Sequence, residues 1–503
     1  MKTLCGIDLG TQSCKVILYD WEKKTTVAKA QVPVDMISGN DGRREQKAEW
    51  YDQALADCFD KLDGTLKKTI AALGVSGHQH SLVPLDGEGK PLYNVKLWCD
   101  TSTQAECDEL TAAAGGEAAL IRLAGLPMRP GYTAPKIQWL KNHKPDAFAK
   151  LAHILLSHDY LNWLLTGEYT AEYGDASGTA LFDVRQRVWS EKVCGLIGPR
   201  VLGALPKLIP PGGAAGRVSA QAAARYGIPQ GAVVAAGGGD NMMGAIGTGT
   251  VRDGTLAMSL GTSGTLFGYS GKPVIDPTGN LAAFCSSTGG WLPLLCTMNC
   301  TVASEELRNL FGMDVQAFDA EAAKAPIGAE GIVVLPFFNG ERTPNLPFGR
   351  ASINGITAAN FNRANIARAS LEAAIFGMRI GLAGFRDLGF TAKEIRLTGG
   401  GAKSSLWQQI AADVTNLPVV LPAGEEAAAL GGAIQALWCL KKQEDPPQED
   451  PSQEGASIEA LCAEHVGIEG GRTVLPDPAA VAAYDKAYAE YEKYLGALGP
   501  LYR

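Results

Sequence analysis

The chain has 503 residues, of which 46% are hydrophobic and 19% are charged. This balance excludes an intrinsically disordered protein, and the length predicts two or three folded domains. A formal net charge of −8 argues against nucleic-acid binding as the main activity. The uncharged stretch at residues 277–304 is rich in Gly, Ser and Thr, so it predicts buried strands and turns rather than a membrane span.

Cysteine usage and the first residues bear on where the protein works. The eleven cysteines are scattered and form no Cys-x-x-Cys pair, which argues against a zinc site. We expect mostly reduced, buried thiols and therefore a cytoplasmic location. The chain reaches Asp8 before any apolar core of signal-peptide length, so we expect no secretory signal.

Short apolar segments bounded by glycine alternate with longer segments whose apolar residues recur at helical spacing. The first kind predicts strands at residues 4–10, 70–77, 232–239 and 331–337. The second kind predicts helices at residues 49–62, 366–385, 405–416 and 479–498. Such alternation predicts layered α/β domains. The charged stretch at residues 441–457 predicts an exposed loop.

The tripeptide Leu-Gly-Thr occurs at residues 9–11 and again at residues 260–262, each time followed by polar residues and an apolar strand. This repetition predicts one phosphate-holding hairpin in each of two domains. Coincidence in a glycine-rich chain is the alternative. A duplicated arrangement places the domain boundary near Gly247, so we expect domains at residues 1–246 and 247–503.

Several motifs of other chemistries are missing from the sequence. There is no Walker A loop, no Gly-x-Ser-x-Gly elbow and no His-Glu-x-x-His motif. His78 and His80 would share one face of a strand, but no third metal ligand is near them in the sequence. A metal site built on these histidines is therefore disfavoured.

Three glycine-rich segments can present backbone N–H groups to a phosphate. They are Gly10-Thr11-Gln12-Ser13, Gly261-Thr262-Ser263-Gly264 and Gly399-Gly400-Gly401-Ala402. The third segment links a predicted strand to a predicted helix, a place where nucleotides often bind. Taken alone, each segment is also compatible with a purely structural turn.

Two carboxylates follow predicted strands. Asp8 stands directly before a turn, where a carboxylate can hold Mg²⁺ through water. Asp240 follows three glycines in a segment without other charges, so it is a candidate base for a sugar hydroxyl and a second carboxylate near Mg²⁺. The structural alternatives are a turn-initiating role for Asp8 and a helix N-cap role for Asp240.

Two longer stretches carry a family resemblance. Residues 131–140, GYTAPKIQWL, and residues 351–372 match two signatures of the FGGY carbohydrate kinases, and the chain resembles that family over nearly its whole length. The resemblance implies two actin-like (ribonuclease H-like) α/β ATPase domains around a central cleft. It also implies that the first domain binds mainly the sugar and that the second binds mainly ATP.

Shorter motifs resemble most closely the family members that act on D-xylulose. They are GHQHS (77–81), LWCD (97–100), GDASGT (174–179), GGGDN (237–241), SLGTSG (259–264) and GERTP (340–344). This resemblance implies transfer of the γ-phosphoryl group of ATP, with Mg²⁺, to O5 of D-xylulose. Another polyol such as ribulose, glycerol or gluconate is an alternative substrate, and an actin-like ATP-driven binding protein is an alternative class.

The residue roles carry over by position. The resemblance implies that Asp240 is the catalytic base, that Asp8 lies near Mg²⁺ and the phosphates, and that the sugar is bound by Gln79, His80, Asn241 and Arg129. Trp98 and Asp100 of the LWCD motif complete the expected sugar site, although Trp98 alternatively fills the floor between the domains. The resemblance places the nucleotide at Thr262, Asn299, Gly401, Ala402 and Ser405, beside the glycine-rich candidates Gly10, Thr11, Gln12, Ser13, Gly261 and Gly400.

The expected partners are few. A small-molecule ketose is the expected substrate, and neither nucleic acid nor a membrane is expected as a partner. A homodimer is the oligomeric state expected from the family resemblance.

Overall fold

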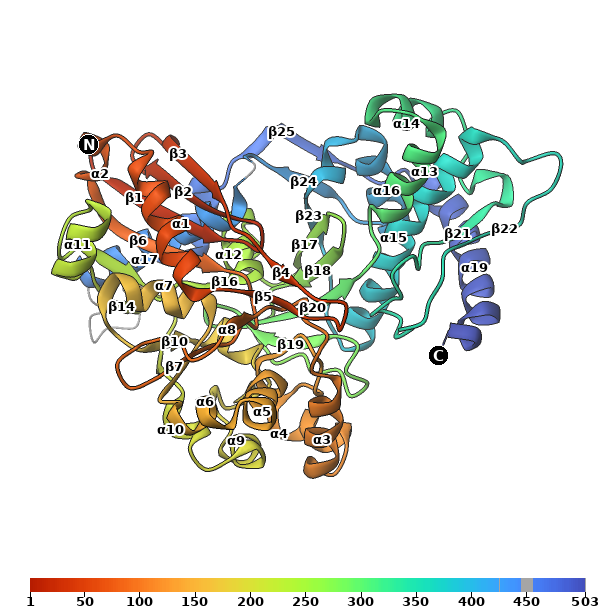
Figure 1. Ribbon diagram of the computed structural model, residues 1–503. Helices are drawn as coiled ribbons and strands as arrows, with labels where there is room; N and C mark the ends of the chain where they lie inside the picture. Colours follow the sequence, from red (N-terminus) through yellow and green to blue (C-terminus); the bar gives the residue numbers. More distant parts are fainter. Residues whose placement is uncertain (425, 445–455, 503) are drawn as a thin grey trace. The chain divides into compact units, whose positions relative to one another are not determined.

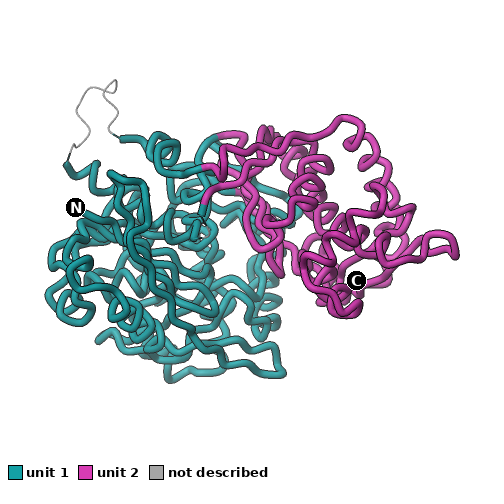
Figure 2. Tube along the Cα trace, turned by 90° about the horizontal axis from the view of Figure 1, so that it is seen from above, with its two compact units in different colours: residues 1–252, 270–292, 424–467 teal, residues 253–269, 293–423, 468–503 magenta. Residues whose placement is uncertain are grey.

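The computed structural model describes residues 1–424, 426–444 and 456–502. The protein divides into two compact units, which are coloured separately in Figure 2. Unit 1 comprises residues 1–252, 270–292 and 424–467, and unit 2 comprises residues 253–269, 293–423 and 468–503. The predicted boundary at Gly247 falls within helix α12 (Asp240–Thr248) of unit 1, and the assignment of sugar and ATP to two domains stays a prediction.

Unit 1 is built on a mixed sheet with the strand order β14-β15-β6-β1-β2-β3 (Figure 1). The strands are β1 (Thr3–Leu9), β2 (Ser13–Asp20), β3 (Thr25–Pro33), β6 (Ile70–Gly77), β14 (Ala214–Arg217) and β15 (Val233–Ala235). The short β16 (Gly238–Gly239) also pairs with β6. Strand β1 is antiparallel to β2 and parallel to β6.

Helices cover both faces of this sheet because successive side chains of a strand point to opposite faces. Cys5 and Ile7 belong to the same buried core as Leu55 and Cys58 of helix α1 (Ala48–Asp60). On the other face, a Cβ atom at Gly6 would lie 1.9 Å from the carbonyl oxygen of Ala429 in helix α17 (Ala427–Glu444). The missing side chain of Gly6 therefore lets α17 lie directly against β1.

Unit 2 is built on a second mixed sheet, in which the strands follow the order β20-β18-β17-β23-β24-β25. They are β17 (Thr255–Leu260), β18 (Gly264–Gly268), β20 (Trp291–Thr297), β23 (Glu394–Thr398), β24 (Val419–Pro422) and β25 (Ile468–Val474). The helices of this unit include α13 (Val302–Phe311), α15 (Arg363–Asp387), α16 (Ser405–Thr415) and α19 (Pro478–Leu498).

The two sheets repeat one pairing pattern. In unit 1, the hairpin β1–β2 continues antiparallel into β3, and β1 pairs with β6 in parallel. In unit 2, the hairpin β17–β18 continues antiparallel into β20, and β17 pairs with β23 in parallel. Each Leu-Gly-Thr tripeptide occupies the first turn of its sheet. The predicted duplication of the hairpin is therefore confirmed, whereas its phosphate-holding role stays a prediction.

A group of helices extends unit 1 beyond its sheet and has its own hydrophobic core. The helices are α3 (Gln104–Ala114), α4 (Glu117–Ala124), α5 (Thr133–His143), α6 (Pro145–Lys150), α9 (Glu191–Ile197) and α10 (Val201–Ala204). Two further helices of unit 1 are α7 (Ser157–Thr166), whose Leu161 and Leu165 belong to the core of the sheet, and α8 (Tyr173–Ser177). Helices α5, α7 and α8 supply side chains to the candidate site.

Most predicted elements are confirmed, including β6 at residues 70–77 and helices α1, α15, α16 and α19. The uncharged stretch forms the strands β19 (Ala282–Cys285) and β20, as expected, whereas its last residues begin the helix α13, which was not expected. The loop predicted at residues 441–457 is wrong at its start, because Lys441–Glu444 complete α17; residues 445–455 lie outside the described residues. Ser457 caps α18 (Ile458–His465).

The eleven cysteines are all free, and nine of them are buried, which confirms the prediction of mostly buried thiols. In the part of the chain that the structure describes, no helix combines the length and apolar character needed to span a membrane.

Candidate active site

Asp240 lies where the sheet of unit 1 gives way to a helix. Strand β16 ends at Gly239, which is the N-cap, and Asp240 is the first residue of α12. The N-cap role considered for Asp240 is thus taken by its neighbour. Oδ1 of Asp240 accepts hydrogen bonds from the backbone N–H (2.8 Å) and from Nδ2 (3.1 Å) of Asn241. Nδ2 of Asn241 also donates to Oε1 of Gln79 at 2.7 Å, so three predicted site residues lie together.

The environment of Asp240 suits a general base. Burial, together with the negative charges of Asp8 and Asp175, raises the pKa of Asp240 to about 7. A carboxylate with such a pKa accepts a proton readily near neutral pH, whereas an ordinary aspartate is a much weaker base. The helix N-terminus alone would stabilise the ionised form, so burial and the neighbouring carboxylates outweigh it here.

Asp8 lies near the end of β1, and its Oδ1 accepts a hydrogen bond from Oγ of Ser76 in the parallel strand β6 at 2.8 Å. Burial raises the pKa of Asp8, while the hydroxyl of Ser76 and the charge of Lys15 oppose this shift. Because Asp8 in turn raises the pKa of Asp240, two carboxylates share one electrostatic environment. A divalent cation bound between them would relieve this repulsion.

The turn that leads to Asp240 is held by a side chain distant in sequence. Gly237 adopts a φ of +75°, and both of its backbone polar groups bond the amide of Gln435 in α17, at 2.8 and 2.9 Å. Nδ2 of Asn162 donates to the carbonyl of Ala236 at 2.8 Å. These bonds satisfy a buried turn and fix the start of α12 relative to α7 and α17.

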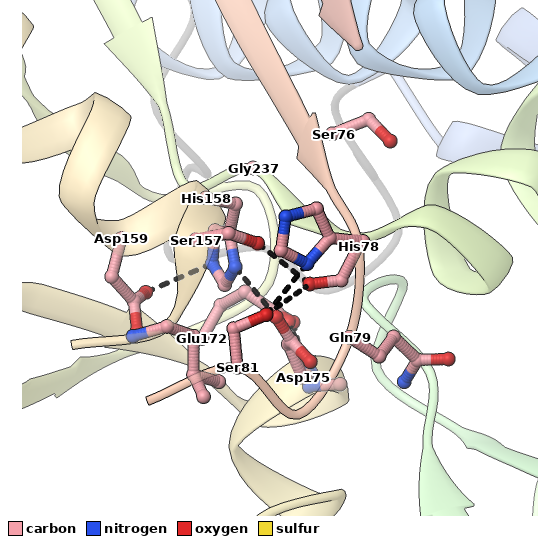
Figure 3. Close-up of polar contacts among 12 residues, drawn as sticks. Ser76, His78, Gln79, Ser81, Ser157, His158, Asp159, Glu172, Asp175 and Gly237 are labelled. Carbon is pink, nitrogen blue, oxygen red and sulfur yellow. Dashed lines mark hydrogen bonds and ion pairs between the residues drawn. The ribbon is translucent and has the colours of Figure 1, made fainter. Parts of the chain in front are cut away.

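A buried histidine joins two carboxylates behind the site (Figure 3). Nδ1 of His158 lies 2.8 Å from Oδ2 of Asp175, and Nε2 lies 2.9 Å from Oδ1 of Asp159. Burial alone would lower the pKa of His158, but the charges and hydrogen bonds of the two carboxylates outweigh it and raise the pKa well above its ordinary value. His158 is therefore protonated at neutral pH and compensates part of the negative charge around Asp240.

The two histidines after β6 do not share a strand face, because the strand ends at Gly77. His78 bonds Oγ of Ser81 at 2.6 Å and the hydroxyl of Tyr51 at 3.2 Å, deep in the core. His80 adopts a φ of +64° and turns its ring toward Tyr132, with the ring centroids 5.1 Å apart. Among the described residues, no group of three or more His, Cys, Asp or Glu side chains is arranged to hold a metal ion.

The remaining sugar candidates have different surroundings. Nε1 of Trp98 donates to Oγ1 of Thr11 at 2.9 Å, which joins this candidate to the first hairpin. Asp100 is fully buried and lies 3.2 Å from Nζ of Lys96, within an internal ion cluster. Arg129 is half-exposed and bonds Glu117. Gln79 and Asn241 thus bond each other beside Asp240, and Trp98 bonds the first hairpin. Asp100 and Arg129 bond other residues.

The first hairpin turn is well ordered by backbone bonds. The N–H of Gly10 donates to the carbonyl of Ser13 at 2.9 Å, and the N–H of Val34 donates to the carbonyl of Gln12 at 2.9 Å. Nε2 of Gln46 donates to the carbonyl of Thr11 at 2.8 Å. The carbonyls of this turn are therefore engaged by the protein.

The nucleotide candidates of unit 2 lie in three segments. The carbonyls of Gly261 and Thr262 accept hydrogen bonds from the N–H groups of Thr301 and Cys300, so the turn of β17–β18 rests on the segment that begins α13. Residues Gly400–Lys403 form a short 3₁₀ helix, and Ser405 is the first residue of α16. The carbonyl of Ala402 accepts a bond from Nε2 of Gln408 at 2.8 Å.

The side chain of Asn299 makes hydrogen bonds to other residues of unit 2. Its Nδ2 donates to the carbonyl of Gly340 at 2.6 Å and to Oε2 of Glu341 at 3.0 Å, while its Oδ1 accepts from the N–H of Asn339. Glu341 also accepts the N–H of Met298 at 2.6 Å. The side chain of Asn299 therefore orders the segment before α13, and contact with a nucleotide stays a prediction.

Sequence reasoning missed three buried side chains that shape the site: Lys136, His158 and Gln435. Gln435 had a detectable signal, since it is a lone polar residue within the apolar run of residues 427–440. His158 follows Ser157 and precedes Asp159 in a pattern with no recognisable spacing, so only the fold reveals its partners. Lys136 lay within a recognised signature, but nothing local indicated its partner.

Comparisons with known proteins bear on the family of the whole chain. Models of the N-terminal and C-terminal domains of the FGGY family of carbohydrate kinases match residues 3–247 and 256–440. A xylulose kinase of Haemophilus influenzae is 43% identical over 506 residues, which cover 99% of both chains. A xylulose kinase of Streptomyces coelicolor is 35% identical, covering 87% of this chain and 88% of the relative.

A solved structure of a kinase is also similar over the whole length of the chain. The structure described as a xyloylose kinase from Brucella ovis has a TM-score of 0.90 at 30% identity, and the match covers 99% of this chain and 100% of that one. The duplicated sheets of the fold thus agree with two family models, which match residues 3–247 and 256–440. The protein belongs to the FGGY family of carbohydrate kinases.

Proposed function

We propose that this protein transfers the γ-phosphoryl group of ATP to O5 of D-xylulose, giving D-xylulose 5-phosphate and ADP. The observation that carries the proposal is Asp240, a carboxylate at the start of α12 whose pKa is raised to about 7 beside the amides of Asn241 and Gln79. The whole-length similarity to the xylulose kinase of Haemophilus influenzae supports D-xylulose as the sugar.

In the proposed reaction, the carboxylate of Asp240 takes the proton of the O5 hydroxyl as O5 forms a bond to the γ-phosphorus. The bond between that phosphorus and the bridging oxygen of ADP breaks, and the electron pair leaves with ADP. Phosphoryl transfer needs positioning and charge stabilisation more than covalent catalysis. A base with a pKa near the working pH suits this task, since such groups accelerate proton transfer by about 10²–10⁴-fold.

The sugar site of the proposal lies in residues 1–246. The amides of Gln79 and Asn241 are bonded to each other beside Asp240, so they are placed to orient hydroxyls next to the base. His80 and Trp98 are partly exposed and are proposed to contact the sugar. Asp100 and Arg129 are proposed as further sugar ligands, although each now bonds another residue.

The nucleotide is proposed to bind through residues 247–503, together with the first hairpin. Gly10, Thr11, Gln12 and Ser13 would meet the phosphates from one hairpin, and Gly261 and Thr262 from the other. The adenosine is proposed to lie at the 3₁₀ segment and the start of α16, which contain Gly400, Gly401, Ala402 and Ser405. Asn299 is proposed to lie near the nucleotide.

Mg²⁺ fits the donor set of Asp8 and Asp240. Both carboxylates are partly accessible, and their repulsion is a feature that a bound cation would relieve. The ion prefers oxygen ligands and keeps several waters, so two carboxylates are sufficient protein ligands. When bound, it would neutralise charge on the phosphate oxygens.

The proposal is tested by ADP release in the presence of ATP and Mg²⁺ with D-xylulose, L-xylulose, D-ribulose, L-ribulose, glycerol and gluconate. We expect the highest kcat/KM on D-xylulose. A maximum on another polyol would be compatible with Asp240 as the base but would reject D-xylulose as the substrate. ATP hydrolysis that no sugar stimulates would favour an ATP-driven binding protein. A homodimer and a cytoplasmic location are further expectations, which light scattering and cell fractionation would check.

A further inference from the structure

Lys136 is fully buried in unit 1, at the first turn of α5. Its Nζ donates hydrogen bonds to the carbonyl oxygens of His80 at 2.6 Å and of Gly131 at 2.8 Å. Burial lowers the pKa of Lys136 to about 7, and the charge of Asp100 opposes this shift in part. A buried ammonium that bonds backbone carbonyls is unfavourable for folding by itself, which indicates a role other than filling the core.

The carbonyl that Lys136 holds belongs to a strained residue. His80 has a φ of +64°, in the left-handed region that residues other than Gly, Asn and Asp rarely adopt. Oγ1 of Thr133, from the same helical turn, donates to the same carbonyl at 3.1 Å. Strained backbone persists only where the surroundings impose it. Lys136 and Thr133 supply such a constraint from α5.

The ring of His80 has little freedom of its own. Its centroid lies 5.1 Å from that of Tyr132 and 5.4 Å from that of Phe284. A Cβ atom at Gly178 would lie 2.3 Å from Cε1 of the ring, so the ring rests directly on that glycine. Because the ring is confined on these sides, the backbone conformation of His80 determines where the imidazole points.

We propose that Lys136 is a positioning residue of the sugar site: by holding the His80 carbonyl, its ammonium fixes the orientation in which the His80 imidazole binds the substrate. The inference rests on the proposed function, in which His80 contacts the sugar. Lys136 is fully buried, so it acts on the sugar through the backbone that it bonds and not by direct contact. Its loss therefore weakens sugar binding and leaves the ATP site unaffected.

The test begins with Lys136→Met, which removes the ammonium and keeps an unbranched side chain. Varying D-xylulose at saturating ATP gives the KM for the sugar, and varying ATP at saturating D-xylulose gives the KM for ATP. We expect the KM for D-xylulose to rise about 10- to 100-fold, the range for loss of a charged hydrogen bond. The KM for ATP should stay within about twofold of the unchanged protein, because no ATP contact is altered.

A double-mutant cycle with His80→Asn separates positioning from general stability. Asn tolerates the left-handed conformation and lacks the imidazole, so Lys136 has nothing left to position. We expect Lys136→Met to change the sugar KM by less than about twofold in that background. Equal factors in both backgrounds would overturn the inference, because they would show an effect independent of His80.

Lys141→Met is the matched control. Lys141 lies on the same helix and also donates to a backbone carbonyl, that of Ile197, away from the site. Its loss should leave the sugar KM unchanged, and a rise equal to that of Lys136→Met would also overturn the inference. If Lys136→Met does not fold, Thr133→Val removes the second bond to the His80 carbonyl. A sugar KM raised about three- to tenfold supports the inference, and an unchanged KM contradicts it.

The outcomes also separate this inference from the proposed function. If the protein without substitutions phosphorylates D-xylulose but the effects of the two substitutions are additive, only the role of Lys136 is rejected. If the protein without substitutions is inactive on D-xylulose, the proposed sugar is rejected. The double-mutant cycle is then measured with whichever of the tested polyols is the best substrate. Inactivity on every polyol rejects both.

Discussion

Nδ1 of His158 lies 2.8 Å from Oδ2 of Asp175, in an interior where neither side chain is exposed to solvent. The same imidazole lies 2.9 Å from Asp159 through its other nitrogen. Asp175 in turn raises the pKa of Asp240. A buried cation thus compensates the carboxylates behind the proposed base, and several measurable consequences depend on this arrangement.

His158→Ala should destabilise the protein by about 3–5 kcal/mol, because it leaves two buried carboxylates without their cation. The pKa of His158 is raised above 6.5 in the folded protein, so its stabilising effect is complete below that pH. The effect is lost only as the pH rises through the raised folded pKa. Urea unfolding at pH 6 measures the difference.

His143→Ala is the control for that measurement. His143 is about half exposed and lies 3.0 Å from Glu106, so water can replace its ring. Its loss should lower stability by less than about 1 kcal/mol. Equal losses for both variants would contradict a special role of the buried histidine.

The reaction should slow at acidic pH, because protonation of Asp240 removes the proposed general base. Burial and the charges of Asp8 and Asp175 raise the pKa of Asp240 to about 7, and a general base must be deprotonated to act. We therefore expect kcat/KM for the sugar to fall as the pH drops through this pKa. Asp175→Asn removes one of the charges that raise the pKa, so the acidic limb should move to lower pH. A limb that stays in place in this variant would show that Asp175 does not act on the base.

Asp240→Ala should lower kcat by about 10²–10⁴-fold with a much smaller change in the KM for the sugar. The reason is that the base acts in the transition state, while Gln79 and His80 continue to bind the substrate in the proposed site. ADP release at saturating substrates measures the loss. The exposed Asp60, at the end of α1, offers a control, since Asp60→Ala should leave turnover unchanged. Near-normal turnover of the Asp240 variant would refute the assignment of the base.

The helix that begins at Asp240 contains two glycines that differ in the space available for a side chain. A Cβ at Gly247 would lie 1.8 Å from the carbonyl oxygen of Ala427 in α17, whereas a Cβ at Gly244 would meet nothing within 4 Å. Gly247→Ala should therefore destabilise the protein by about 1–3 kcal/mol or more, because backbone must move. Gly244→Ala should stabilise it by about 0.5–1 kcal/mol, since Ala is the better helix former.

Thermal unfolding of the two variants measures this contrast. We expect the melting temperature to fall for the first variant and to rise slightly for the second. Similar changes in both would mean that the contact between α12 and α17 does not limit stability.

Local sequence determined much of the secondary structure and supplied the candidates for the site. Glycine-bounded apolar runs located β1 and β6, and helical spacing located α1, α15 and α16, because burial of one face repeats along each element. The repeated Leu-Gly-Thr predicted two hairpins. Asp8 and Asp240 were predicted to be site residues because each carboxylate was expected to follow a buried strand, and their roles stay predictions. The start of α12 was placed less well, since Gly239 rather than Asp240 is its N-cap.

Only the tertiary structure decided which side chains meet. Lys136 reaches the carbonyl of His80, and Gln435 reaches both backbone groups of Gly237, across segments far apart in the chain. His158 joins Asp159, its neighbour in sequence, to Asp175 on another helix. Such contacts depend on the order in which strands pair and helices cover a sheet, and the local periodicity of a segment carries no record of that order. The protonation of the proposed base depends on them too, because burial and neighbouring charges exist only once the chain is folded.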